Sequence, residues 1–203
     1  MIQSNYEPTQ SDFNQISWKY AQHVYGAVSP EECFLLFKYA YLAAQLAIKQ
    51  GKVPNIVEIG SYCGRSSSVL AGVVRESGGH LTCVDPFITA APGIPDVKAE
   101  CLKHLNKTGA DFTLLDTTSE EAVKQHKGKI DFLFVDGDHR YEWTKLDCQL
   151  WLPKLKIGHD VAFHDYYGSW EGVKKAVDEE TLFTGDYTKI AETQSLIIVM
   201  KEG

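Results

Sequence analysis

Residues 56–66, which read IVEIGSYCGRS, constrain the fold of this chain more than any other segment. An apolar run that carries Glu58 leads into Gly60, three residues separate Gly60 from Gly64, and a helix-compatible segment, 67–75, follows. This pattern predicts a buried parallel strand that turns tightly into a helix. Glycines allow such a turn and the close approach of a ligand, and the N–H groups that open the helix bind polar ligand atoms. The segment therefore predicts a site for a nucleotide-like ligand, in which Glu58 accepts hydrogen bonds from hydroxyl or ammonium groups.

Strand-like and helix-like segments alternate from residue 54 onward, which predicts an α/β fold: a parallel sheet with helices on both faces. The expected strands are 55–59, 81–85, 112–115, 131–136 and 160–164, and the expected helices are 65–76, 96–107, 118–126 and 140–152. Two apolar runs near the end, 187–191 and 195–200, predict a closing antiparallel hairpin. Before the sheet we expect a tail over 1–14, a short helix over 15–26 and a long amphipathic helix over 30–50, which begins with Ser29 as N-cap and Pro30.

Length and charge exclude several classes of protein. The 203 residues suffice for one α/β domain, here divided into a helical extension, 1–52, and a core, 53–203. A net charge of −7 argues against nucleic acid or an anionic membrane as the main partner. No apolar run approaches the roughly 20 residues of a membrane span, and five scattered cysteines without a C-x-x-C pair favour reduced thiols. We expect a cytoplasmic protein.

The glycine spacing indicates which nucleotide-like ligand the turn takes. A dinucleotide fingerprint has a middle glycine, where this chain has Tyr62. Asp85 ends the second expected strand, where an acid commonly binds ribose hydroxyls. With these residues the chain resembles the class I S-adenosylmethionine (SAM) methyltransferases, and VEIGSYCGRS is similar to the first motif of catechol-type O-methyltransferases.

That resemblance implies a three-layer Rossmann-like methyltransferase fold, with a mostly parallel seven-stranded sheet and an antiparallel strand in the C-terminal hairpin. It also implies SAM as cofactor. In related enzymes the loop after the third strand lies against the adenine, although its threonines and Ser119 could equally cap the next helix. The expected cofactor-binding residues are Glu58, Gly60, Ser61, Tyr62, Gly64, Ser66, Asp85, Pro86, Phe87, Asp116, Thr117 and Ser119.

Four polar residues follow the fourth and fifth expected strands: Asp136, His139, His164 and Asp165. Because the carboxyl ends of parallel strands meet at one edge of the sheet, we expect these side chains beside the cofactor. Carboxylates and an imidazole so placed suit a divalent cation. His139 could remove a proton from an acceptor hydroxyl, since imidazole titrates near neutral pH, or could be a hydrogen-bonded structural residue.

The stretch from Asp136 to Tyr166 resembles the methyltransferases that include macrocin-type sugar O-methyltransferases and cephalosporin-hydroxylase-like proteins. In those relatives, an acid after the fourth strand and an acidic pair after the fifth hold magnesium. The ligands carried over are Asp136, His164 and Asp165. A histidine stands here where the relatives have a carboxylate, so a softer metal, or no metal, stays open alongside Mg²⁺.

The expected function is methyl transfer from SAM to a hydroxyl of a small molecule, with Asp136 and His139 as catalytic residues. Three alternatives stay open. A metal-dependent nucleotide-sugar transferase would use the D-x-D of residues 136–138, and an NAD-dependent oxidoreductase is permitted by Asp85. A protein that binds SAM without turnover is the third.

Aromatic residues around these motifs have less certain roles. Trp143 and Trp151 lie eight residues apart on one expected helix, which favours core packing. Tyr166, Tyr167 and Trp170 follow the fifth strand and could line an acceptor pocket. The apolar N-terminal helix could serve a homodimer, and the sequence does not reveal the acceptor.

Overall fold

The computed structural model describes residues 6–203 of the chain. Eighteen elements follow one another, with β-strands and helices alternating through the middle of the chain. They are α1 (Gln10–Phe13), the π-helical turn η1 (Asn14–Trp18), α2 (Lys19–Ala21), α3 (Pro30–Lys49), β1 (Asn55–Ile59), α4 (Arg65–Ser77), β2 (His80–Val84), α5 (Val97–Thr108), β3 (Phe112–Leu115), α6 (Ser119–Gln125), β4 (Ile130–Val135), α7 (Tyr141–Trp151), the 3₁₀ turn η2 (Leu152–Lys154), β5 (Leu155–Phe163), α8 (Glu171–Val177), the π-helical turn η3 (Asp178–Leu182), β6 (Tyr187–Thr193) and β7 (Leu196–Lys201).

Seven strands form one mixed sheet in the order β3-β2-β1-β4-β5-β7-β6. The strands β1 to β5 pair in parallel, whereas β7 runs antiparallel between β5 and β6. The predicted seven-stranded sheet with an antiparallel C-terminal hairpin is thus confirmed. The chain reverses direction across the sheet between β1 and β4, and the carboxyl ends of strands at such a switch point form a crevice where α/β proteins bind ligands.

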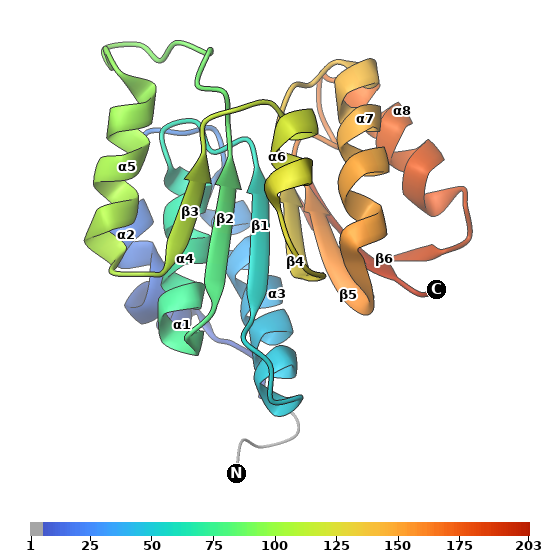
Figure 1. The fold of residues 1–203 in the computed structure, drawn as a ribbon, viewed down its shortest axis with the longest axis horizontal. Helices are drawn as coiled ribbons and strands as arrows, with labels where there is room; N and C mark the ends of the chain where they lie inside the picture. The colour runs from blue at the N-terminus through green and yellow to red at the C-terminus, as the bar shows by residue number, and fades with distance from the viewer. Residues whose placement is uncertain (1–5) are drawn as a thin grey trace.

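Side chains alternate between the two faces of the sheet and form two apolar cores. Phe132 and Phe134 of β4 pack in the core that contains residues of α3, α4 and α5. Leu133 and Val135 face the opposite way, into the core that Trp151 and Val177 complete from α7 and α8. Figure 1 shows the resulting layers, with α6 and α7 in front of the sheet and α3 and α4 behind it.

Local signals fix where the long N-terminal helix begins. Ser29 caps α3, its hydroxyl accepting from the Glu32 N–H, and the Glu32 carboxylate accepts from the Ser29 N–H in return. Pro30 occupies the first turn, where its missing N–H costs nothing. This capping box fixes the first turn of α3 and turns the Glu32 side chain back toward the sheet.

The structure differs from the predicted elements in several places. Residues 10–13 form α1 rather than part of a tail, since Thr9 and Asp12 make a capping box and Phe13 is buried against α3. Residues 1–5 of the expected tail lie outside the described residues. The fifth strand begins at Leu155, five residues before the expected start, and α8 with η3 was not predicted.

Within residues 6–203, no helix is both long and apolar enough to cross a membrane, and all five cysteines are buried without a disulfide.

Asp160 in β5 carries a carboxyl group whose burial raises its pKa from an ordinary 3.8 to about 7. The unfolded chain therefore ionises at lower pH than the folded protein, so this residue makes folding less favourable as pH rises from about 4 to about 7. We expect Asp160→Asn to raise the free energy of unfolding by about 2 kcal/mol at about pH 8, after allowance for solvent screening. Denaturant titration checks this. At about pH 3, below the pKa of the Asp160 carboxyl in both the folded and the unfolded state, variant and wild type should nearly agree; an equal gain at both pH values would contradict the assignment.

Candidate active site

A cavity of about 720 Å³ opens at the carboxyl ends of β1, β2, β4 and β5. Its floor is the turn from β1 to α4, and its walls include the segments after β2, after β4 and before α3. A second hollow, along α8, contains none of the motifs that the sequence singled out except the tyrosines that follow β5. The larger cavity is therefore the candidate functional site.

The turn from β1 to α4 adopts a backbone that glycine favours. Gly60 and Gly64 have φ angles of 88° and 91°, and Tyr62 between them is also left-handed, with φ 47°. A Cβ atom at Gly60 would lie 1.9 Å from the carbonyl oxygen of Asp136. The turn and the segment after β4 are therefore packed backbone against backbone, which only glycine permits.

Glu58 lies beneath this turn and not on the wall of the cavity. Its side chain is fully buried and accepts hydrogen bonds from the hydroxyls of Ser61, at 2.7 Å, and Ser67. Burial raises the pKa of the Glu58 carboxyl to about 7, although these serine hydroxyls oppose the shift. Glu58 thus anchors the turn from beneath through Ser61 and Ser67, and the expected hydrogen bonds from a ligand to Glu58 stay a prediction.

Asp85, directly after β2, also holds the turn. One oxygen of its carboxylate accepts from the backbone N–H groups of Ser61, at 2.9 Å, and Tyr62, at 2.7 Å. The other oxygen accepts from the N–H of Phe87 at 2.6 Å. A carboxylate offers about four lone-pair positions, so Asp85 keeps one for a hydroxyl group in the cavity that it lines.

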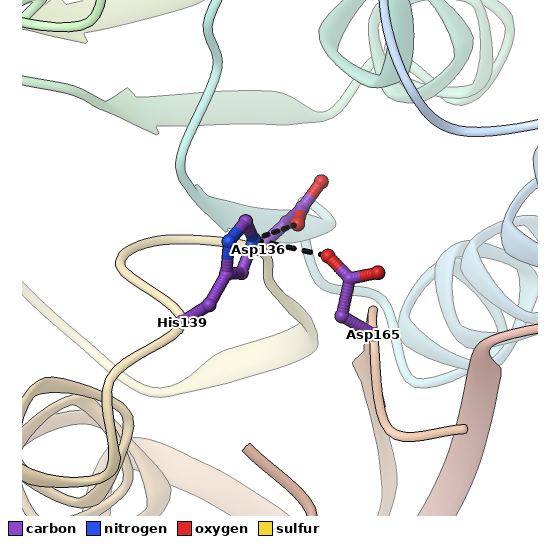
Figure 2. A group of neighbouring side chains, drawn as sticks. All are labelled: Asp136, His139 and Asp165. Atoms are coloured by element: carbon purple, nitrogen blue, oxygen red, sulfur yellow. Dashed lines mark ion pairs between the residues drawn. The ribbon is translucent and has the colours of Figure 1, made fainter. Parts of the chain in front are cut away.

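Asp136, His139 and Asp165 meet at the edge of the cavity, and Figure 2 shows the His139 ring facing both carboxylates. The Nε2 atom of His139 lies 3.0 Å from an oxygen of Asp165 and 3.6 Å from an oxygen of Asp136. Hydrogen bonding to Asp136, and then to Asp165, raises the pKa of His139 to about 9, against the effect of burial. The ring also stacks on Trp170, at 4.8 Å between centroids. The three groups can take up or release a proton beside a bound molecule.

His164 lies behind this cluster, only 4% exposed. Its Nδ1 atom is 3.2 Å from an oxygen of Asp136 and 3.2 Å from an oxygen of Asp165, and its Nε2 atom is 3.3 Å from Glu32. Burial alone would lower the pKa of His164, but the hydrogen bonds to these three carboxylates outweigh it and raise the pKa to about 12. The ring is therefore a buried cation at neutral pH.

The comparisons with known proteins agree with this geometry. The profile of a family described as a methyltransferase domain matches residues 57–166, which is more than half of the chain. The chain belongs to this methyltransferase family. The matched segment runs from β1 to the residues after β5, and so contains the glycine turn, Asp85 and the Asp136–His139–Asp165 cluster.

Solved structures with the same fold include O-methyltransferases. The methyltransferase is similar to NovP, at 16% identity and a TM-score of 0.68, over 82% of this chain and 79% of that one. It is similar to TomG from Streptomyces achromogenes, solved with SAM, at 15% identity and a TM-score of 0.63, over 98% and 93%. It is also similar to an O-methyltransferase from Bacillus cereus, solved with SAH, at 15% identity and a TM-score of 0.60, over 96% of this chain and 92% of that one. At these identities the likeness establishes the fold.

Most of the residues that the sequence proposed for the cofactor and for catalysis line the cavity of the methyltransferase, and the structure brings them together from five segments of the chain. The predicted residues on the wall are Gly60, Ser61, Tyr62, Ser66, Asp85, Pro86, Ser119, Asp136, His139 and Asp165. The predicted residues outside it are Glu58, Gly64, Phe87, Asp116, Thr117 and His164. Of these, Asp116 instead forms an ion pair with Lys98 at 2.7 Å.

Sequence reasoning missed parts of the wall. The loop before α3 supplies Tyr25, and α7 supplies Trp143 and Asp147. Trp151 is buried as expected, but Trp143 is 42% exposed and faces the cavity, so its expected place in the core is wrong. Trp143, Asp147 and Trp151 follow one another at intervals of four residues on α7, so helical spacing alone does not separate the exposed Trp143 from the buried Trp151.

The expected metal site includes His164, but carboxylates engage both of its ring nitrogens in this structure. Asp136, His139 and Asp165 lie close enough to surround an ion, but they offer an imidazole where Mg²⁺ prefers oxygen atoms. The cationic His164 ring, 3.2 Å from an oxygen of each aspartate, also repels a softer divalent cation. These residues do not fit the metal that the resemblance implies.

Proposed function

We propose that this methyltransferase transfers a methyl group from SAM to a hydroxyl oxygen of a small molecule. The observation that carries the proposal is the contact between the two halves of the site. The glycine turn that would hold the donor packs directly against the backbone of Asp136, which begins the proton-accepting cluster. Structures of the same fold with SAM or SAH bound, in O-methyltransferases, support this assignment.

The cavity has the features that a SAM molecule needs. The first turn of α4 has no side-chain cap, and its residues Arg65 and Ser66 line the cavity, so the N–H groups of this turn suit polar ligand atoms. The remaining lone pair of Asp85 suits a ribose hydroxyl. Ser119, Trp143 and Asp147 close the far end, where an adenine ring would find one aromatic face and polar partners.

Bound SAM would supply an electrophilic methyl group, so the protein has two remaining tasks: to position the hydroxyl and to take its proton. The new O–CH₃ bond forms as the S–CH₃ bond breaks, and the hydroxyl proton leaves toward the protein. Asp136 and His139 share one network at the cavity edge. Because the pKa of His139 is raised to about 9, its ring is protonated at neutral pH, so we assign the carboxylate of Asp136 as the proton acceptor. His139 orients that carboxylate, and Trp170 packs against the His139 ring.

Aromatic side chains around the entrance favour an acceptor with a flat or ring-shaped body. Tyr25 and Tyr62 lie 6.1 Å apart between ring centroids on one side. Trp170, 48% exposed, lines the other side beside His139. Such rings bind phenols by stacking and sugars through their apolar faces. Tyr166 and Tyr167 pack against each other and border the separate hollow, so they do not shape this pocket.

The alternative function, a metal-dependent nucleotide-sugar transferase, is not supported by the D-x-D segment. Asp138 turns away from Asp136 and accepts hydrogen bonds from the backbone and guanidinium of Arg140. Its carboxylate therefore caps the segment before α7 rather than joining a metal site.

Transfer of a labelled methyl group tests the proposal. The enzyme is incubated with SAM that carries a trideuterated methyl group, together with phenols, sugars, amines and thiols, and products are identified by mass spectrometry. We expect the label on oxygen of one hydroxyl class. Labelling of an amine or a thiol alone would contradict the proposal, and SAM binding without transfer to any acceptor would favour the SAM-binding alternative.

A further inference from the structure

Glu32 contacts the residues behind the active-site wall from the first turn of α3. It is the third residue of α3, is 2% exposed, and lies 3.3 Å from the Nε2 atom of His164. One oxygen of its carboxylate also accepts from the Ser29 N–H, and the other accepts from the N–H and the hydroxyl of Ser195, at 2.9 and 2.7 Å. Four contacts from three segments hold this carboxylate, which is far more than a helix cap requires.

The contacts of His164 determine the protonation state of its ring. An ionised carboxylate only accepts hydrogen bonds, so each ring nitrogen that faces a carboxylate must carry a hydrogen. Nδ1 faces Asp136 and Asp165, and Nε2 faces Glu32. A neutral imidazole has one N–H and would leave one of these contacts without a proton. His164 is therefore an imidazolium, enclosed by three carboxylates.

The position of the positive charge on His164 determines which groups it stabilises. His164 contacts Asp136 and Asp165 from the buried side, at 3.2 Å each. Two carboxylates that approach one site repel each other and need a cation between them or a shared proton. A divalent ion is the usual solution at an oxygen-rich site. Here the ring of His164 provides the positive charge, and Glu32 holds the ring in place.

We propose that the imidazolium of His164, held by Glu32, replaces a divalent metal in this methyltransferase: it draws Asp136 and Asp165 together and makes methyl transfer independent of metal. His164 is a positioning residue in this scheme, since it lies behind the cavity wall. The statement about transfer rests on the proposed function, whereas the statement about metal exclusion does not.

Metal-dependent stability tests the replacement. The substitution His164→Gln removes one of the two histidines that contact Asp136 and Asp165, and it removes the imidazolium that faces Glu32. The variant should therefore melt at lower temperature than wild type. About 10 mM MgCl₂ or MnCl₂ should then restore part of that loss, because a cation that binds only the folded state stabilises it. Wild type should not respond to either salt. A melting temperature of His164→Gln that ignores both salts would overturn the proposal.

The matched control is His159→Gln. His159 is also 4% exposed and lies in β5, where its ring contacts the backbone oxygen of Asp131. A merely structural loss of a buried imidazole lowers the melting temperature without any response to metal, and we expect that result for the control. A response of this control as large as that of His164→Gln would show a general salt effect and would overturn the proposal.

Direct metal binding gives the second readout. The double substitution Glu32→Gln with His164→Asp removes the ion pair and adds a carboxylate beside Asp136 and Asp165. Calorimetry with MnCl₂ should find at least about tenfold tighter binding to the double variant than to wild type, or about 1.4 kcal/mol. Equal affinity in a variant that circular dichroism shows to be folded would overturn the proposal, as would tight binding by wild type. Neither measurement involves SAM or an acceptor, so a failure here is distinct from a failure of the proposed function.

Discussion

Replacement of Gly60 by alanine should abolish ligand binding by this methyltransferase. The added Cβ would lie 1.9 Å from the Asp136 carbonyl oxygen and 2.5 Å from its carbon, and both are backbone atoms that cannot move aside cheaply. We expect Gly60→Ala to lower the free energy of unfolding by about 3 kcal/mol or more. Displacement of the turn should also weaken SAM binding about 100-fold or more, which corresponds to about 2.7 kcal/mol. Denaturant titration and calorimetry measure the two effects.

Gly51→Ala is the matched control for this substitution. Gly51 ends α3 with a φ of 70°, and a Cβ there would have no atom within 4 Å. The control therefore carries the strain of a left-handed alanine, about 1 kcal/mol, without the clash. It should keep wild-type affinity for SAM. Equal effects of the two substitutions would mean that backbone strain alone, and not the contact with Asp136, explains the loss.

Asp136→Asn should remove most turnover while SAM affinity stays close to that of wild type. An amide cannot accept a proton at neutral pH, and it also loses the charge that His139 and His164 face. Loss of a group that takes part in proton removal lowers rates by about 10²–10⁴-fold, so a fall of that size in kcat is expected. Steady-state kinetics with the acceptor identified by labelled methyl transfer measures it.

Asp138→Asn separates this effect from a general change of charge in the loop. Asp138 lies two residues away, is exposed, and pairs with Arg140 rather than with the cluster. Its substitution should leave kcat within about threefold of wild type, since exposed ion pairs contribute little. A comparable loss in both variants, or full activity of Asp136→Asn, would contradict the catalytic role of Asp136.

The parts of the candidate site that could be predicted from the sequence depend on short-range patterns. The glycine turn could be recognised because a buried strand, an acid and two glycines lie within nine residues, 56–64. Asp85 and Asp136 could be placed because each directly follows an apolar strand, and parallel strands bring their carboxyl ends together. Because β1 and β4 are neighbours in the sheet, the residues that follow these strands lie side by side and line one cavity.

The residues that sequence reasoning misplaced depend on contacts between distant segments. Glu32 reads as an ordinary helix cap, and nothing near it in sequence signals that His164, 132 residues away, completes its contacts. His164 looks like a metal ligand by position, but its protonation is decided by three carboxylates from separate elements. Glu58 was expected to meet a ligand, yet the serines of the turn surround it, because helix α4 folds back over the end of β1.

Titration of the purified protein with SAM in a calorimeter tests the central claim most directly. The account predicts a single site with a micromolar dissociation constant, equal before and after treatment with a chelator. Asp85→Ala should bind SAM at least about tenfold more weakly, because it loses both the ribose partner and the anchor of the glycine turn. Absence of binding by wild type, or binding that Asp85→Ala leaves unchanged, would contradict the assignment of this cavity to SAM.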